Sequence, residues 1–450
     1  MLKALKSHRF EAAQIIVIFY VFAILIATGL FCLPVALKPG VDWSFLDALF
    51  TAVSAVSVTG LAVVPYVDTF STTGIFFLMF ILQFGGIGIM TLGTFFWLMI
   101  GKKIGIKERQ LISIDHNRSQ LSGLVNVMKQ IVLIIFLIEM VGAAILGTYF
   151  LQYYPTWQQA YLQGTFASIS ATTNAGFDLT GMSLIPFAHD YFVQSIYIIL
   201  LTLGAIGFPV LIEVKDYIKL RKESRPFHFS LYTKLTTVTF FSLMLFGTVV
   251  ILLIESTHFF VNKSWHEAFF YAFFHSSSTR NGGLATIDIN YFSDSTLLVL
   301  CFFMFIGASP SSVGGGIRTT TFAILLLLLF SFARGKKDVR VFKREIHEED
   351  IKKSVVVTFL ALLLCFIATI ILKRTERFSL MEIVFEVSSA FGTTGLSTGI
   401  TPDFTMIGKI ILMILMFIGR IGILTFIFLF DKGENNDDFY HYPKERVIVG

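Results

Sequence analysis

Eight long hydrophobic segments alternate with shorter polar segments along the 450-residue chain. About 20 apolar residues of helix cross the hydrocarbon core of a bilayer, and most of the segments have roughly this length. The pattern therefore predicts an all-α integral membrane protein with eight transmembrane helices. The segments cover roughly residues 12–34, 72–100, 131–151, 192–213, 235–254, 297–333, 354–372 and 407–430.

Four short glycine-containing stretches recur between these segments. Each follows a semi-apolar run, rich in Ser, Ala and Phe, that is about one short helix long. Gly60, Gly176, Gly283 and Gly395 lie 116, 107 and 112 residues apart, and this near-regular period indicates an internal fourfold repeat. The stretches are Ser57–Leu61, Thr173–Phe177, Arg280–Leu284 and Thr393–Leu396, and the preceding runs are Asp47–Val56, Gly164–Ala171, Glu267–Ser276 and Glu382–Ala390.

Each repeat is expected to contain a helix, a re-entrant short helix with its glycine loop, and a second helix. Two spans per repeat return the chain to the same side, so four repeats can surround a central pore along the membrane normal. A small-residue motif recurs 24 to 28 residues after each glycine, beginning at Gly85, Gly204, Gly307 and Gly419, and supports the alignment. We expect repeats at 1–129, 130–222, 223–345 and 346–432, and a cytoplasmic tail at 433–450.

Composition and charge agree with a lipid environment. Only 14% of the residues are charged, whereas a soluble domain has about 25%. Of the 35 Lys and Arg residues, 26 lie on one side of the membrane if every segment spans once, and six lie on the other. This bias places both termini in the cytoplasm and the glycine stretches on the outer side, and it argues against nucleic acid as a partner. The three cysteines are far apart in apolar runs and predict neither a disulfide nor a metal site.

The glycine stretches suit the passage of a cation. A cation that crosses lipid must exchange its water shell for protein oxygens, and potassium channels supply rings of backbone carbonyls. Glycine adopts the backbone angles that such a loop requires, and one glycine per repeat gives a single fourfold ring. The predicted filter residues, where K⁺ would bind, are Val58, Thr59, Gly60, Asn174, Ala175, Gly176, Asn281, Gly282, Gly283, Thr393, Thr394 and Gly395.

Four stretches of the sequence resemble the Trk/Ktr/HKT superfamily of potassium transporters, and within it the KtrB-type (KtrB/KtrD) membrane subunits. They are TAVSAVSVTGL at 51–61, NAGF at 174–177, AFGTTGL at 390–396 and FIGRIGILT at 417–425. The resemblance covers nearly the whole chain. It implies a K⁺ selectivity filter at the four glycines, a homodimer in the bacterial plasma membrane, and a cytoplasmic nucleotide-binding RCK ring that regulates uptake.

Two features of the filter bear on selectivity. Sodium-selective plant relatives of this superfamily carry a serine at the first glycine position, where this chain has Gly60. The third stretch departs from the family pattern, because Asn281-Gly282 stands where Thr-Ala is more usual.

The sixth segment, at 297–333, is too long for one span and too short for two. Pro310 and the glycines at 314–316 break a helix, so the segment is either a kinked helix or two helices joined by a loop. The resemblance supports a loop that crosses the pore beneath the filter as a gate. The predicted gate residues are Gly307, Ala308, Ser309, Pro310, Ser311, Ser312, Val313, Gly314, Gly315, Gly316 and Arg420.

Arg420 breaks the fourfold pattern, since Gly86, Ala205 and Ala308 stand at the corresponding positions. A charge at membrane depth is costly and is usually functional. Its five donors suit the carbonyls of the gate loop. The alternative is a structural ion pair with a carboxylate such as Glu386.

The chain contains neither a GxGxxG motif after a strand nor a Walker A motif, so we expect no cofactor in this chain and ATP or ADP on a separate subunit. The basic connections at 101–109, 216–225 and 335–344 are the candidate docking sites, and anionic lipid is a second partner for them. K⁺ is the expected transported ion, with Na⁺ as a candidate activator.

Several alternatives stay open at this stage. Symport of K⁺ with Na⁺ or H⁺ is the alternative within the same superfamily. A membrane enzyme lacks support, since no paired acid and base or metal cluster stands out, and a scaffold leaves four matching loops unexplained. Glu139 in the third segment and His275 in the third short helix favour helix packing over a proton relay or a ligand site.

Overall fold

The structure is a computed structural model that describes residues 12–88, 91–93, 95, 98, 124–223, 226–336, 338–427, 443 and 445. The statements below concern these residues. The helices are α1 (Ala12–Phe31), α2 (Phe45–Ser57), α3 (Tyr66–Thr69), α4 (Thr72–Ile87), α7 (Leu124–Tyr149), α8 (Trp157–Thr172), α9 (Tyr191–Ala205), α10 (Phe208–Lys222), α11 (Leu231–Glu255), α12 (Trp265–Ser278), α13 (Asp294–Ile306), α14 (Thr319–Ala333), α15 (Glu348–Thr375), α16 (Leu380–Gly392), α17 (Met406–Ile421) and α18 (Ile423–Ile427). Strands β1 (Arg340–Val341) and β2 (Arg344–Glu345) form one antiparallel hairpin.

The four predicted short helices are present as α2, α8, α12 and α16. Each begins at a Ser or Thr whose side chain or capping box satisfies a backbone N–H of the first turn. In α12 and α16 the cap is a reciprocal capping box, Ser264 with Glu267 and Ser379 with Glu382. The hydrogen bonds from Ser264 lower the pKa of the Glu267 carboxyl, because they favour its charged form.

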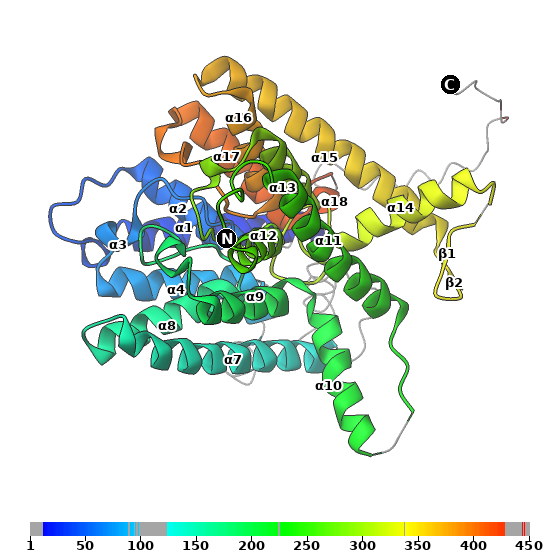
Figure 1. Ribbon diagram of the computed structural model, residues 1–450, viewed down its shortest axis with the longest axis horizontal. Helices are drawn as coiled ribbons and strands as arrows, with labels where there is room; N and C mark the ends of the chain where they lie inside the picture. The colour runs from blue at the N-terminus through cyan, green and yellow to red at the C-terminus, as the bar shows by residue number, and fades with distance from the viewer. Residues whose placement is uncertain are drawn as a thin grey trace, which may run out of the picture.

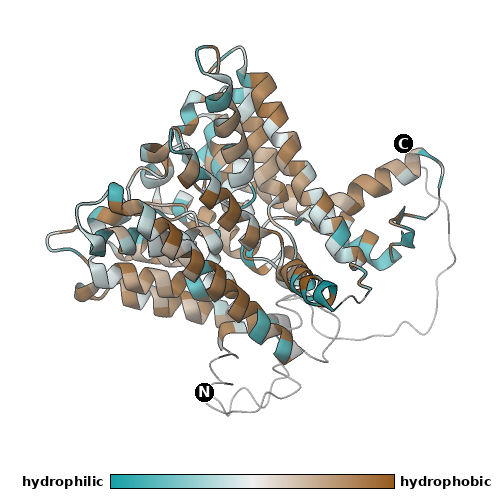
Figure 2. Cartoon of the chain, turned by 60° about the horizontal axis from the view of Figure 1, so that its bottom comes forward, coloured by the Kyte–Doolittle hydropathy of each residue, from teal (hydrophilic) through white to brown (hydrophobic). Residues whose placement is uncertain are grey.

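Four helices are long and apolar enough to cross a membrane, and each precedes one of the short helices. The spans are Gln14–Phe31, Val125–Gln152, Leu231–Glu255 and Glu348–Thr375, and the second includes a 3-10 turn at Phe150–Gln152 after α7. Large apolar side chains such as Phe22, Met140 and Phe359 are exposed on their outer faces. Figure 2 shows hydrophobic residues along the helices and hydrophilic residues toward their ends. The chain is thus an all-α protein of the membrane.

The second helix of each repeat is shorter, and a glycine with positive φ lies one or two residues after its last residue. These glycines are Gly88 (φ 98°), Gly207 (φ 103°), Gly307 (φ 67°) and Gly422 (φ 86°). Sequence analysis treated the fourth and eighth segments, 192–213 and 407–430, as continuous, and this was wrong. The fourth bends by 101° between α9 and α10, and α17 ends at Ile421. In Figure 1, α10 leaves the body of the molecule at this bend.

The sixth segment is two helices, α13 and α14, joined by an irregular stretch at 307–318. This excludes one continuous kinked helix. We call residues 307–318 the intramembrane loop.

Helix α7 begins at Leu124, before the expected boundary between the first two repeats, and the hairpin at 340–345 was not expected. The connection at 101–109 and the tail at 433–450, apart from Pro443 and Glu445, lie outside the described residues.

Candidate functional site

The four glycine stretches share an unusual backbone conformation. In each, the glycine has a positive φ between 67° and 92°, and so does the residue two positions earlier, with φ between 50° and 70°. The residue between them has a negative φ. The four loops thus repeat one irregular backbone pattern. The residues that precede the glycines in this way are Val58, Asn174, Asn281 and Thr393.

The four glycines form a closed ring in chain order. A Cβ added to Gly60 would lie 2.9 Å from the Cα of Gly176, and one added to Gly176 would lie 3.0 Å from the Cα of Gly283. From Gly283 the corresponding distance to the Gly395 Cα is 3.3 Å, and from Gly395 to the Gly60 Cα it is 3.1 Å. A side chain at any of the four positions therefore meets the backbone of the next loop.

A buried serine in each short helix supports the loop that follows. The hydroxyls of Ser54 and Ser389 accept hydrogen bonds from the N–H of Gly60 (3.1 Å) and Gly395 (3.0 Å). The other two serines bond the residue after the glycine. Ser170 donates to the Phe177 carbonyl (2.6 Å), and Ser278 bonds both the N–H and the carbonyl of Leu284.

Sequence analysis did not single out these serines. The signal was available, because a serine recurs five or six residues before every ring glycine. Each also accepts a backbone hydrogen bond from the residue that precedes the glycine. The serines tie the end of each short helix to its loop.

The third loop makes a tighter turn than the others. The Gly282 N–H bonds the Ser278 carbonyl four residues earlier (2.6 Å), whereas the corresponding bonds in the other loops span five residues. A Cβ at position 282 would lie 2.7 Å from the Ser278 Cα. The shorter turn accounts for glycine at this position, where the resemblance had made alanine the expected residue.

The intramembrane loop lies against the third and fourth glycine loops. A Cβ at Gly314 would lie 2.6 Å from Oδ1 of Asn281, and one at Gly315 would lie 2.6 Å from Oγ1 of Thr393. Both contacts are with the residue two positions before the ring glycine, at the beginning of the loop. The intramembrane loop therefore covers the third and fourth glycine loops on the side nearest to their short helices.

The loop also fills the break in the fourth segment. Because of the bend, the carbonyls of Gly204 and Ala205 and the N–H of Phe208 have no place in a continuous helical ladder. They bond Val313 N–H (3.4 Å), Ser309 N–H (3.1 Å) and the Ser311 carbonyl (2.8 Å), respectively. Each break thus supplies backbone partners to the other.

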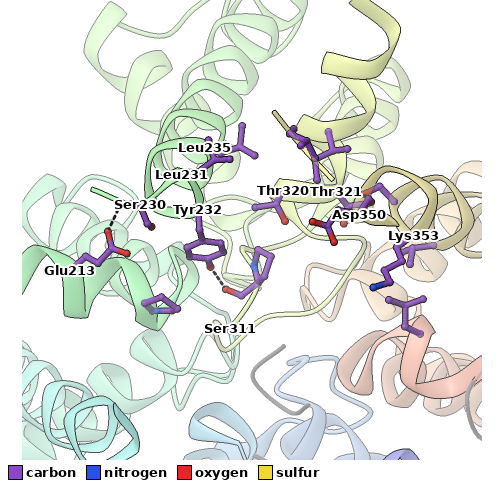
Figure 3. Close-up of a pocket in the computed structure, with 17 residues that line it drawn as sticks. Glu213, Ser230, Leu231, Tyr232, Leu235, Ser311, Thr320, Thr321, Asp350 and Lys353 are labelled. Carbon is purple, nitrogen blue, oxygen red and sulfur yellow. Dashed lines mark hydrogen bonds between the residues drawn. The ribbon is translucent and has the colours of Figure 1, made fainter. Parts of the chain in front are cut away.

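A cavity of about 580 Å³ opens beside the loop, between α10, α11, α14 and α15 (Figure 3). Pro310 and Ser311 form part of its wall. The Tyr232 hydroxyl, on α11, donates to the Pro310 carbonyl, and Glu213 on α10 accepts from the Ser230 N–H at 3.0 Å. Tyr232 therefore holds the loop from this side, and Glu213 joins α10 to the start of α11.

Three buried or half-buried arginines bond the loop or the helix end before it. Arg420 donates to the Val313 carbonyl in the loop and to the carbonyls of Gly85 and Gly86 at the end of α4. Arg318 donates to the Gly314 and Ser309 carbonyls. The sequence pattern predicts Arg420 as a gate residue but gives no such role to Arg318.

Arg280 donates to the carbonyls of Phe303 and Gly307 at the end of α13. Its side chain is 1% exposed. The charge count assigns the third glycine stretch, with this arginine, to the outer side of the membrane and says nothing of its depth. The structure buries the side chain.

The other singled-out residues make local contacts. Glu386 accepts hydrogen bonds from Ser397, Thr398 and Thr401, so it is not the partner of Arg420. Glu139 accepts from the Gln83 amide and joins α7 to α4. His275 bonds the Tyr271 carbonyl at 2.8 Å. These contacts favour helix packing for Glu139 and His275.

The tight third turn generates a stability prediction. Gly282→Ala restores the residue that is more usual in the family pattern, yet its methyl group meets the Ser278 backbone. We expect a loss of about 1–3 kcal/mol, the usual cost of overpacking. Thermal unfolding in detergent measures this loss.

The matched control for this prediction is Ala175→Gly, which makes the reverse exchange at the corresponding position of the second loop. It introduces no clash, so it should cost only about 0.4–1 kcal/mol through the entropy of the unfolded chain. An unchanged unfolding midpoint for Gly282→Ala would contradict the tight turn.

Comparison with known proteins gives the family. The model of the TrkH cation transport proteins matches residues 11–442. The chain is 63% identical to the Ktr system potassium uptake protein D of Bacillus subtilis, over 97% of each chain. It is 31% identical to the potassium/sodium uptake protein NtpJ of Enterococcus hirae, over the full length of both.

A solved structure shows the same fold. The potassium transporter TrkH from Vibrio parahaemolyticus matches with a TM-score of 0.73 at 19% identity, over 95% of this chain and 86% of that one. The family model spans almost the whole chain, and the family transports cations and does not catalyse reactions. The chain therefore belongs to the TrkH family of cation transport proteins.

Proposed function

We propose that this chain is the K⁺-selective pore of a bacterial potassium uptake system. The observation that carries the proposal is the closed ring of Gly60, Gly176, Gly283 and Gly395, each in a left-handed conformation. Backbone carbonyls in such a ring replace the hydration shell of K⁺. The 63% identity to a Ktr potassium uptake protein supports K⁺ as the cation.

In this proposal K⁺ binds along the twelve filter residues named above. The supporting serines hold the loops in a fixed geometry, so the ring favours one ion size and coordination number over another. The four loops carry no acidic side chain among these twelve residues, which agrees with a monovalent ion. The ion moves down its electrochemical gradient into the cytoplasm.

We assign the gate to the intramembrane loop together with Arg420. The loop contacts the third and fourth filter loops and so stands in the path of an ion that leaves the filter. The loop has no helical ladder. Within it, the Ala308 N–H bonds the Gly315 carbonyl and Arg318 bonds two loop carbonyls, and further bonds run to the break in the fourth segment and to Arg420. A segment without a helical ladder can open at modest cost. Arg420 also places a positive charge near the path, which opposes a cation.

The proposed assembly is a homodimer in the plasma membrane with both termini in the cytoplasm. A cytoplasmic RCK ring that binds ATP or ADP would regulate it. The name of the relative, a potassium uptake protein of a Ktr system, supports a partner subunit. The basic last turn of α10, with Lys219, Arg221 and Lys222, and the hairpin at 340–345 are the described candidate contacts for the ring or for anionic lipid.

Coupled transport is the second candidate. The relative NtpJ is named for both potassium and sodium, so Na⁺ is a candidate co-substrate or activator here as well. Fluxes recorded with the Na⁺ and H⁺ gradients clamped separately distinguish a symporter from a pore, since a pore follows the K⁺ gradient alone.

The filter assignment predicts a loss of selectivity. Replacing any ring glycine by Ser inserts a side chain against the next loop, and we expect the K⁺-to-Na⁺ permeability ratio to fall about tenfold, or ~1.4 kcal/mol of relative stabilisation. Flux of each ion into proteoliposomes measures the ratio. Gly40→Ser is the matched control, because Gly40 also has a positive φ (82°) but no neighbour within 4 Å. Normal selectivity in folded variants at all four positions would refute the filter.

The gate assignment predicts higher flux when the loop is shortened. Deleting residues 311–314 should raise K⁺ flux without the regulatory ring, and Arg420→Ala should raise it partly. Because the two share the Val313 contact, the combined change should give less than the sum. Arg334→Ala, at the exposed end of α14, is the control. Flux at or below the wild-type level in a folded, dimeric deletion variant would refute the assignment of the gate to this loop.

The partner assignment predicts how nucleotide binds. Calorimetry should detect no ATP binding by the purified chain, and binding should appear when the soluble RCK subunit is added. Binding of ATP to the purified chain alone would show that the partner assignment is wrong.

A further inference from the structure

Asn281 is the residue at which the third loop departs from the family pattern, and its side chain leaves its own repeat. The Nδ2 group donates to the Gly392 carbonyl (2.5 Å), the Thr393 carbonyl (2.9 Å) and Thr393 Oγ1 (2.9 Å). All three acceptors belong to the fourth repeat. The Asn281 amide therefore ties the third filter loop to the fourth.

The other end of the same amide faces the intramembrane loop. Asn281 is fully buried, and its Oδ1 has no hydrogen-bond partner among the described residues. A buried, unpaired amide oxygen is unfavourable, because it has lost its hydrogen bonds to water and gained none in the protein. Gly314 packs against this oxygen, since a Cβ there would lie 2.6 Å from Oδ1. Gly315 stands in the same relation to Thr393. The intramembrane loop thus contacts both Asn281 and Thr393, whose side chains join the third filter loop to the fourth.

Asn174, the asparagine at the corresponding position of the second loop, shows that an asparagine here need not join one repeat to another. It occupies the same place in the second loop with the same left-handed backbone, φ 51° against 70° for Asn281. In the orientation that satisfies its amide, Asn174 donates to the Ala171 and Leu201 carbonyls and accepts from the Ala205 N–H. All of these bonds lie within its own repeat. The difference between the two asparagines lies in what their amides contact.

We propose that Asn281 is a positioning residue that couples the gate to the selectivity filter. With the loop in place, Gly314 holds the Asn281 amide against Thr393, and the third and fourth filter loops stay in register. When the loop withdraws, the amide gains space and Oδ1 faces the ion path, so the tie between the loops weakens. The K⁺-to-Na⁺ ratio then depends on the state of the loop. This inference rests on the filter and the gate proposed above.

The test is a double-variant cycle on the K⁺-to-Na⁺ permeability ratio in proteoliposomes. It compares the wild type, Asn281→Ala, the deletion of 311–314, and both changes together. We expect the deletion to lower the ratio several-fold in the wild type and to have no further effect in Asn281→Ala. In Asn174→Ala, the matched control, the deletion should still lower the ratio.

A conservative variant separates positioning from folding. Threonine is accommodated in this backbone conformation, since Thr393 has φ 50° at the corresponding place. Asn281→Thr keeps one donor, so it should retain part of the ratio and part of the dependence on the loop. It also serves as the test variant if Asn281→Ala does not fold.

The two proposals fail in different ways. Additive effects of the deletion and the Asn281 variants would overturn the coupling, and so would an unchanged ratio in the deletion variant. If Gly395→Ser also leaves the ratio unchanged, the filter itself is wrong. If Gly395→Ser lowers the ratio while the Asn281 effects are additive, the filter stands and the coupling alone fails.

Discussion

The structure depends on one constraint, which is that a backbone polar group at membrane depth needs a protein partner or water. A filter and a gate both require irregular backbone where lipid would otherwise demand helix. Each irregular stretch here is satisfied by another one or by a side chain. The break after α9 bonds the intramembrane loop, buried serines bond the filter loops, and arginines bond the carbonyls at helix ends.

The same constraint divides the molecule into a fixed part and a releasable part. The filter loops hold Val58, Asn174, Asn281 and Thr393 in left-handed conformations that L residues adopt rarely, so their surroundings must over-determine them. Short helices with capped starts and buried serines provide this. The intramembrane loop has no helical ladder, and several of its bonds are made to the fourth segment, Tyr232 and Arg420. A rigid filter beside a separable loop is what a gated, selective pore requires.

Much of the fold and of the candidate filter was predictable from the sequence, because the same elements recur in four repeats. The short helices and ring glycines stood out since four copies at a near-regular spacing agree, although any one copy resembles an ordinary turn. The bend at Gly207 was missed because it lies in an apolar run, and periodicity does not separate one bent segment from one straight span. The burial of Arg280 was missed because counting charges per connection says nothing of depth. The Asn281–Thr393 bond joins residues 112 apart, and only the packing of the repeats brings them together.

The central claim is that the four glycine loops form one K⁺ site, and anomalous diffraction from crystals that contain Rb⁺ or Tl⁺ in place of K⁺ tests it most directly. The account predicts an anomalous peak on the axis of the ring formed by Gly60, Gly176, Gly283 and Gly395, within coordination distance of backbone carbonyls from all four loops. The peak should weaken when K⁺ is added in competition, and Na⁺ should displace it far less. A ring without a peak, or a peak bound by side chains away from the ring, would contradict the account.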